Sequence, residues 1–199
     1  YSSVGLLFGL DNTMVLAATE PELLQRACDF FVDLQSRYIQ AQVEAGAHAI
    51  WVGDCNAFSG MLSLKQYREF AFPSCKNLVE QAHQFGAIVH LHNSEILVPY
   101  LLAEAELGVD IVNCGPAADM EVVATALRDR VCFSGNLDPI ETLMRGTAAD
   151  VAREAKRLVK LCYPGGGYLF NTGEMKPRDV PTENMRAMGE GARRASAAP

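Results

Sequence analysis

The sequence lacks the features that mark several classes of protein. It has no apolar run near the roughly 18 residues that a membrane-spanning helix needs, and no basic segment followed by an apolar one stands after Tyr1. Its net charge is −7 and its lysines and arginines are spread out, so the sequence shows no cationic patch for a nucleic-acid backbone. We therefore expect a cytoplasmic protein that binds neither a membrane nor nucleic acid.

The chain also lacks a cysteine pair with the Cys-x-x-Cys spacing of many metal and redox motifs. Its six cysteines are scattered, mostly in apolar surroundings, as reduced thiols in a cytosolic protein are. With 199 residues, 49% of them hydrophobic and 21% charged, the chain can bury one sizeable core. We expect a single domain over residues 1–199, and a homo-oligomer is left open.

Helical and strand-like segments alternate along the chain. Thr19 and Glu22 match a capping box and Pro21 suits a first helical turn, so we expect a long amphipathic helix that ends near Gly46. Short apolar runs are typical of strands at 47–55, 87–92, 109–114, 130–136 and 166–171. Helices are expected over 64–85 with an interruption at Pro73, 95–107, 118–128, 139–162 with a break near Gly146, and 181–194.

Strands that alternate with helices predict right-handed crossovers and a parallel sheet, and hence an α/β fold. The strands are continuously apolar, which fits burial on both faces. Two architectures stay open: a doubly wound open sheet, and a (β/α)8 barrel, for which the chain is short because a full barrel takes about 250 residues. In both architectures the functional site lies at the carboxyl ends of the strands.

Polar side chains lie at the carboxyl end of every expected strand. They could bind a metal, a proton or a carboxylate, although Asp and Asn also cap helices and build turns. Their presence after every strand favours a functional site over chance. The residues are Asp54, Cys55, Asn56, His90, His92, Asn93, Asn113, Cys114, Asn136, Asp138, Asn171 and Glu174.

The strand at 87–92 carries two histidines two positions apart. Side chains at this spacing point to the same face of a strand, so His90 and His92 can reach one point while Val89 and Leu91 pack on the other face. Zinc accepts neutral imidazole and carboxylate ligands, and a catalytic site uses three of them. Both histidines and a third residue from another strand end would suffice. The alternative is that one histidine is a hydrogen-bonded core residue and the other an ordinary polar side chain.

Several stretches resemble the uroporphyrinogen decarboxylase family. The likeness runs from about Pro21 to Arg194, and the combination of Gly-Asn-Leu-Asp-Pro with the closing Asp-x-Pro-x-Glu-Asn is specific. It implies a (β/α)8 TIM barrel of which this chain is the C-terminal part, with the N-terminal strands preceding Tyr1 and an open sheet edge where they would pair. The stretches are EAGAHAIWVGD, LSLKQYREFAFP, GAIVHLHNS, LGVDIVN, VCFSGNLDPIETLMRGTAADV and GGGYLFNTGEMKPRDVPTENMRAM.

The resemblance favours the zinc- and corrinoid-dependent methyltransferase branch of this family. That branch has His-x-Cys where this sequence has His90-Leu91-His92, and a second Cys near the position of Glu174, so the implied zinc ligands are His90, His92 and Glu174. Two thiolates are thereby replaced by harder ligands, which weakens the case for a thiol substrate. The implied reaction moves a methyl group between a small methylated donor or thiol and a corrinoid carried by a partner protein.

The remaining strand-end residues receive roles from their positions. Asp54 is expected to orient an imidazole or protonate the leaving group, with Glu174 and Asn136 also catalytic. Substrate contacts are expected from Asn113, Asp138 and Asn171, with Asp138 shaping the mouth of the cleft together with Asn136.

Two other functions stay open. A uroporphyrinogen decarboxylase needs no metal and uses a His in its closing Phe-Asn-x-Gly-His loop, but here Glu174 follows Phe-Asn-Thr-Gly. Its four-acetate substrate would also want Arg or Lys at the cleft, where this chain has carboxylates and imidazoles. The second alternative is a degenerate, non-catalytic barrel that serves as a scaffold or binds a corrinoid protein.

Overall fold

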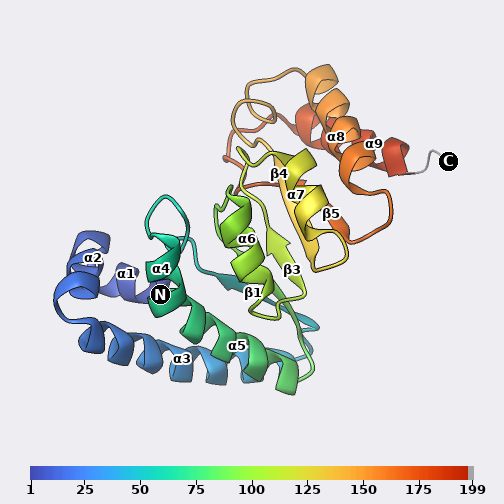
Figure 1. Cartoon of the computed structure of the whole chain (residues 1–199). Helices are drawn as coiled ribbons and strands as arrows, with labels where there is room; N and C mark the ends of the chain where they lie inside the picture. Colours follow the sequence, from blue (N-terminus) through green and yellow to red (C-terminus); the bar gives the residue numbers. More distant parts are fainter. Residues whose placement is uncertain (197–199) are drawn as a thin grey trace. The chain divides into compact units, whose positions relative to one another are not determined.

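The computed structural model describes residues 1–196 as an α/β protein (Figure 1). The chain divides into two compact units. The first contains Tyr1–Asn93 and Leu102–Ile111, and the second contains Ser94–Leu101 and the residues from Val112 on. The expectation of one domain stays a prediction. No helix among the described residues is both long and apolar enough to cross a membrane.

The first unit begins with three helices, α1 (Ser2–Phe8), α2 (Leu10–Thr19) and α3 (Pro21–Glu44). The first two were not expected from the sequence. The long helix is confirmed and Pro21 starts it, but the expected capping box is wrong, because the Thr19 hydroxyl donates to the Val15 carbonyl as the last residue of α2. The helix α3 is preceded by Glu20, which makes no side-chain cap.

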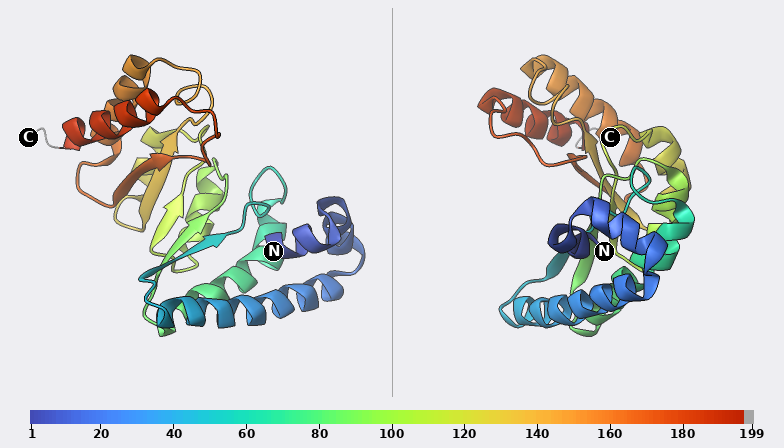
Figure 2. Two further views of the ribbon diagram at one scale, coloured as in Figure 1. Left: turned by 180° about the vertical axis from the view of Figure 1, so that it is seen from behind. Right: turned by 90° about the vertical axis from the view of Figure 1, so that its left-hand side faces the viewer.

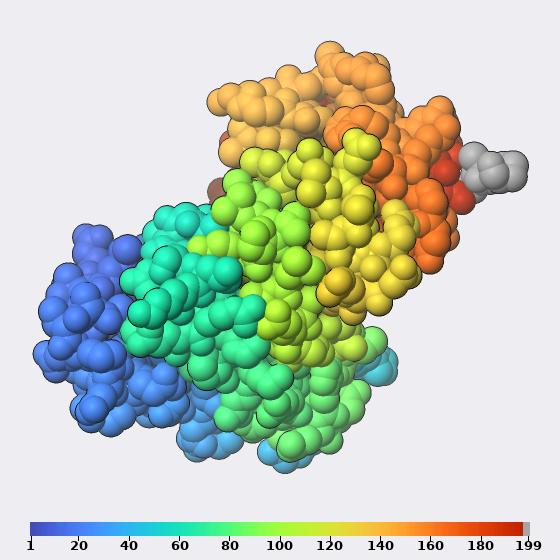
Figure 3. All heavy atoms as spheres, in the orientation of Figure 1, coloured from blue at the N-terminus to red at the C-terminus, as the bar shows by residue number. Residues whose placement is uncertain are grey.

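The helices α1 and α2 expose much of their apolar surface. Leu6 is 83% exposed, Leu7 65% and Val15 57%, while Val4 is fully buried. Figure 3 shows these helices in blue at the surface of the first unit. Their buried side joins a small core that includes Leu24 and Cys28 of α3.

The rest of the first unit contains β1 (Ala49–Gly53), α4 (Leu64–Gln66), η1 (Tyr67–Ala71), α5 (Phe72–Gln84) and β2 (Ile88–His92). The expected interruption near Pro73 is confirmed, because the π-helical turn η1 separates α4 from α5. Pro73 lies in the first turn of α5, where its missing N–H costs no hydrogen bond. The helices α3 and α5 pack against each other, and the left view of Figure 2 shows them side by side.

The second unit contains α7 (Met120–Leu127), β4 (Cys132–Leu137), α8 (Ala148–Cys162), β5 (Tyr168–Thr172) and α9 (Thr182–Ser196). Two elements belong partly to each unit, α6 (Val98–Ala105) and β3 (Ile111–Asn113). Residues 139–146 form turns rather than the expected helix, and α8 starts at a capping box of Thr147 and Asp150. The helices α8 and α9 pack against each other.

The strands are hydrogen-bonded in the order β1-β2-β3-β4-β5, so β1 and β5 are the edge strands of the sheet that the described residues form. The strand β1 pairs with β2 in parallel, with Trp51 opposite His90 and Gly53 opposite His92. The strand β4 pairs with β5 in parallel, with Asn136 opposite Asn171. The predicted parallel α/β fold is confirmed, and the carboxyl ends of neighbouring strands within each unit therefore lie at the same edge.

Candidate functional site

The two histidines of β2 share a face, as the sequence predicts. Val89 and Leu91 are 0% and 2% exposed on one face, whereas His90 and His92 are half-buried on the other. The His92 ring stacks on the indole of Trp51 in β1, with ring centroids 5.1 Å apart and the planes 29° from parallel. The strand thus presents two imidazoles next to a large aromatic ring.

The surroundings of His90 keep its imidazole neutral. Burial lowers the pKa of His90 below its ordinary value, and the neighbouring charge of His92 lowers it further. Neutral imidazole is the form that ligates a metal, because the ring nitrogen must offer its lone pair. His90 therefore has the protonation state that a metal ligand needs.

Asp54 follows β1 and lies at the same end of the sheet as His92. Its backbone N–H donates to the His92 carbonyl at 2.9 Å, and its carboxylate accepts the backbone N–H of Ser2, the first residue of α1, at 2.7 Å. Asp54 is 7% exposed. A carboxylate at a helix N-terminus is favourable, so Asp54 anchors α1. Its catalytic role stays a prediction.

A buried polar pair lies just after His92. The amide of Asn93 donates to the Glu104 carboxylate at 2.6 Å and more weakly to the Ala57 carbonyl at 3.4 Å, and both side chains of the pair are at most 1% exposed. Sequence reasoning missed Glu104. A signal was present, because Glu104 interrupts the apolar run of a helix at a position that faces the core.

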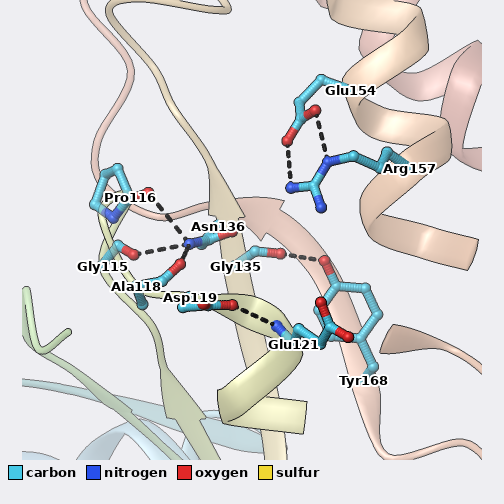
Figure 4. Close-up of polar contacts among 10 residues, drawn as sticks. All are labelled: Gly115, Pro116, Ala118, Asp119, Glu121, Gly135, Asn136, Glu154, Arg157 and Tyr168. Carbon is cyan, nitrogen blue, oxygen red and sulfur yellow. Dashed lines mark hydrogen bonds and ion pairs between the residues drawn. The ribbon is translucent and has the colours of Figure 1, made fainter. Parts of the chain in front are cut away.

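In the second unit, Asn136 is held by the loop after β3 (Figure 4). Its Nδ2 donates to three carbonyl oxygens, those of Gly115 at 3.0 Å, Pro116 at 3.2 Å and Ala118 at 2.8 Å. Asn136 is 6% exposed. Its amide hydrogens are thus committed to holding this loop, and its catalytic and cleft roles stay predictions.

The loops after β3 and β5 meet closely in this unit. A Cβ added at Gly173 would lie 2.5 Å from the backbone nitrogen of Pro116, which is closer than atoms can approach. Just beyond it, the Ser94 hydroxyl donates to the half-buried Glu174 carboxylate at 2.8 Å. Sequence reasoning missed Ser94, and no local pattern marks a partner 80 residues away.

The three residues expected to contact substrate have different surroundings. Asn113 is 1% exposed. The Asp138 carboxylate accepts the N–H groups of Ile140 and Glu141 at 2.7 and 2.8 Å, as in a turn or helix cap. Asn171 is exposed, and its side-chain oxygen accepts the N–H of Thr172 at 2.8 Å. All three substrate assignments stay predictions.

The described residues of either unit hold no group of three or more His, Cys, Asp or Glu side chains arranged to bind a metal. The first unit supplies the His90–His92 pair, and the second unit supplies Glu174. The zinc site with all three residues stays a prediction.

Comparison with known proteins identifies the family of this chain. The family model described as uroporphyrinogen decarboxylase (URO-D) matches residues 6–195. The chain belongs to the uroporphyrinogen decarboxylase family. A member from Chlorobium luteolum named uroporphyrinogen decarboxylase is 31% identical over 182 residues, which are 89% of this chain and 51% of that protein. One of the same name from Aromatoleum aromaticum is 29% identical, over 87% of this chain and 48% of its own. The chain thus spans about half the length of these relatives.

A solved structure of the same fold is a methyltransferase from Methanosarcina mazei. It matches with a TM-score of 0.85 and 22% sequence identity, over 95% of this chain and 54% of that one. This likeness shows the fold. The chain is therefore part of a TIM barrel of the uroporphyrinogen decarboxylase type, and the sequence-based fold is confirmed.

Proposed function

We propose that the protein is a zinc-dependent methyltransferase that moves a methyl group between a small methylated donor or thiol and a corrinoid on a partner protein. The observation that carries this proposal is the pair of half-buried imidazoles, His90 and His92, on one face of β2 at the carboxyl end of the strand. A nitrogen-rich pair on a strand end suits zinc. Zinc bound there would supply Lewis acidity toward the heteroatom that carries the methyl group.

The protein's own residues would position the reactants. Trp51 stacks on His92 and limits the directions in which that ring can turn. Asp54 is joined to the His92 carbonyl through its backbone N–H, so it holds the end of β2 in place. In the second unit, the Ser94 hydroxyl donates to the Glu174 carboxylate and fixes one of its oxygens.

Metal analysis of the purified full-length protein tests the proposal. We expect one zinc per chain, and we expect His90→Ala and His92→Ala each to lower both bound zinc and methyl transfer at least tenfold. His48→Ala is the matched control, because His48 is exposed at the other end of β1 and should change neither quantity. Zinc that survives both substitutions, or full methyl transfer by the metal-free protein, would contradict the proposal.

A decarboxylase is the second candidate, and the names of the relatives at about 30% identity favour it. Release of carbon dioxide from uroporphyrinogen by metal-free protein, unchanged in His90→Ala, would establish this reading. A protein that binds no zinc and catalyses neither reaction would instead support a scaffold that binds a corrinoid protein.

A further inference from the structure

A cationic cavity lies at the amino ends of β4 and β5, away from the strand ends that carry Asn136 and Asn171. It has a volume of about 330 Å³, within the range of small-molecule sites of roughly 300–1,000 Å³. The segment Arg128–Cys132 lines one side and the run Gly165–Gly167 lines the other. The carbonyl of Gly167 accepts the N–H of Phe133 at 3.0 Å, which joins the two sides.

The glycine run leaves room at the cavity. All three glycines have positive φ angles, of 90°, 82° and 71°, which other residues rarely adopt. A Cβ at Gly166 or Gly167 would meet nothing within 4 Å, so the space over this backbone is open. At Gly165 a Cβ would lie 3.2 Å from the guanidinium of Arg128, which therefore lies directly over the glycine backbone.

Two arginines give the cavity its charge. Arg128 is half-buried and donates to the Pro164 carbonyl, and Arg130 is exposed at the rim. Neither guanidinium forms an ion pair among the residues that the structure describes, whereas Arg145, Arg153 and Arg157 of the same unit do. Asp129 is the one acidic residue of the lining, and burial raises the pKa of the Cys132 thiol, which stays neutral. An acidic protein thus keeps a cavity with a net positive lining.

We propose that this cavity binds a phosphate group, as free phosphate or as a phosphate monoester. The guanidinium of arginine donates two parallel hydrogen bonds to such an oxyanion, and backbone without side chains lets the anion approach closely. The cavity shares no residue with the proposed metal site, so this proposal does not depend on the proposed function.

Calorimetric titration of the full-length protein with inorganic phosphate, at fixed ionic strength, tests the proposal. We expect saturable binding that weakens about tenfold in Arg130→Gln and in Arg128→Gln, because each loses charged hydrogen bonds. Arg145→Gln is the matched control, since it removes an arginine of the same unit outside the cavity and should bind as the original protein does.

The substitution Asp129→Asn tests whether charge in the cavity controls phosphate binding, without disturbing the fold. Asp129 has a φ of 67°, and Asn adopts this conformation as readily as Asp does, so the backbone should be unchanged. Removing its charge should tighten phosphate binding about two- to fivefold.

Phenyl phosphate that binds as tightly as inorganic phosphate would identify a monoester site, and preference for inorganic phosphate would identify a site for the free ion. Absence of saturable binding, or equal weakening in Arg145→Gln, would overturn the proposal.

Discussion

In the first unit, His90 and His92 stand half-buried at the end of β2 beside the ring of Trp51. In the second unit, Asn136 stands at the end of β4 with its amide donating to three carbonyl groups of one loop. Both kinds of residue look alike in the sequence, as polar side chains after an apolar strand. The difference shows that one polar strand end can hold a loop in place while another presents two half-buried rings on one face of a strand. Stability and metal binding should therefore respond to different substitutions.

The largest loss of stability is expected from Asn136→Ala. It would leave the carbonyl groups of Gly115, Pro116 and Ala118 without their buried donor, at a cost of about 3 kcal/mol. Urea denaturation measures this loss. Asn171→Ala is the control, because Asn171 is the register partner of Asn136 but is exposed, and it should change stability by less than about 0.5 kcal/mol. Equal losses of stability in the two variants would contradict the structural role of Asn136.

A somewhat smaller loss is expected from Asn93→Ala in the first unit. Glu104 would lose a buried hydrogen bond of 2.6 Å, at a cost of about 2 kcal/mol. The free energy of unfolding in urea again gives the value, with Asn77→Ala on the exposed side of α5 as control. Unchanged stability of Asn93→Ala would mean that the first unit does not depend on the Asn93–Glu104 pair. The first unit would then differ more strongly from the second, which is expected to depend on Asn136.

A pH-dependent effect is expected from Asp110. Burial acts to raise its pKa, but the Val89 N–H at 2.7 Å and the His83 imidazole at 2.9 Å outweigh it, so the pKa lies below the ordinary value. A lowered folded pKa stabilises the protein above the unfolded value of about 3.9, and this contribution is lost as the pH falls through the folded pKa.

Asp110→Asn should therefore lower stability at pH 7 by less than about 1 kcal/mol, because both partners are partly exposed. The difference between the variant and the original protein should shrink as the pH falls below about 4. Denaturation curves at pH 7 and pH 3 measure it. A difference that grows at the lower pH would have the wrong sign and would contradict this assignment.

The smallest effect on stability is expected from His92→Ala. The His92 ring is half-buried and stacks on Trp51, which is itself 60% exposed, so the loss should be about 0.5 kcal/mol. Thermal unfolding of the metal-free protein measures it without the contribution of bound zinc. A loss as large as that of Asn136→Ala would make His92 a structural residue and remove the contrast between the two units.

The alternation of helix and strand could be read from the sequence with small errors at the ends. The periodicity of apolar residues and the positions of Pro21 and Pro73 act within a few residues of chain, so they are visible locally. The helices α1 and α2 were not predicted, because their exposed apolar residues, such as Leu6 and Leu7, leave no amphipathic pattern. The apparent capping box at Thr19 failed because its hydroxyl had a nearer acceptor in α2.

The sequence by itself determined the parallel α/β fold, because its strands alternate with helices that serve as crossovers. It also determined the common face of His90 and His92, because side chains two positions apart on a strand point the same way. Only the tertiary structure decided which groups the polar side chains at the strand ends contact. The partners of Asn136 lie 18 to 21 residues before it, and Ser94 and Glu174 are 80 residues apart. Such contacts depend on how loops from different strands approach one another, and no local pattern encodes that approach.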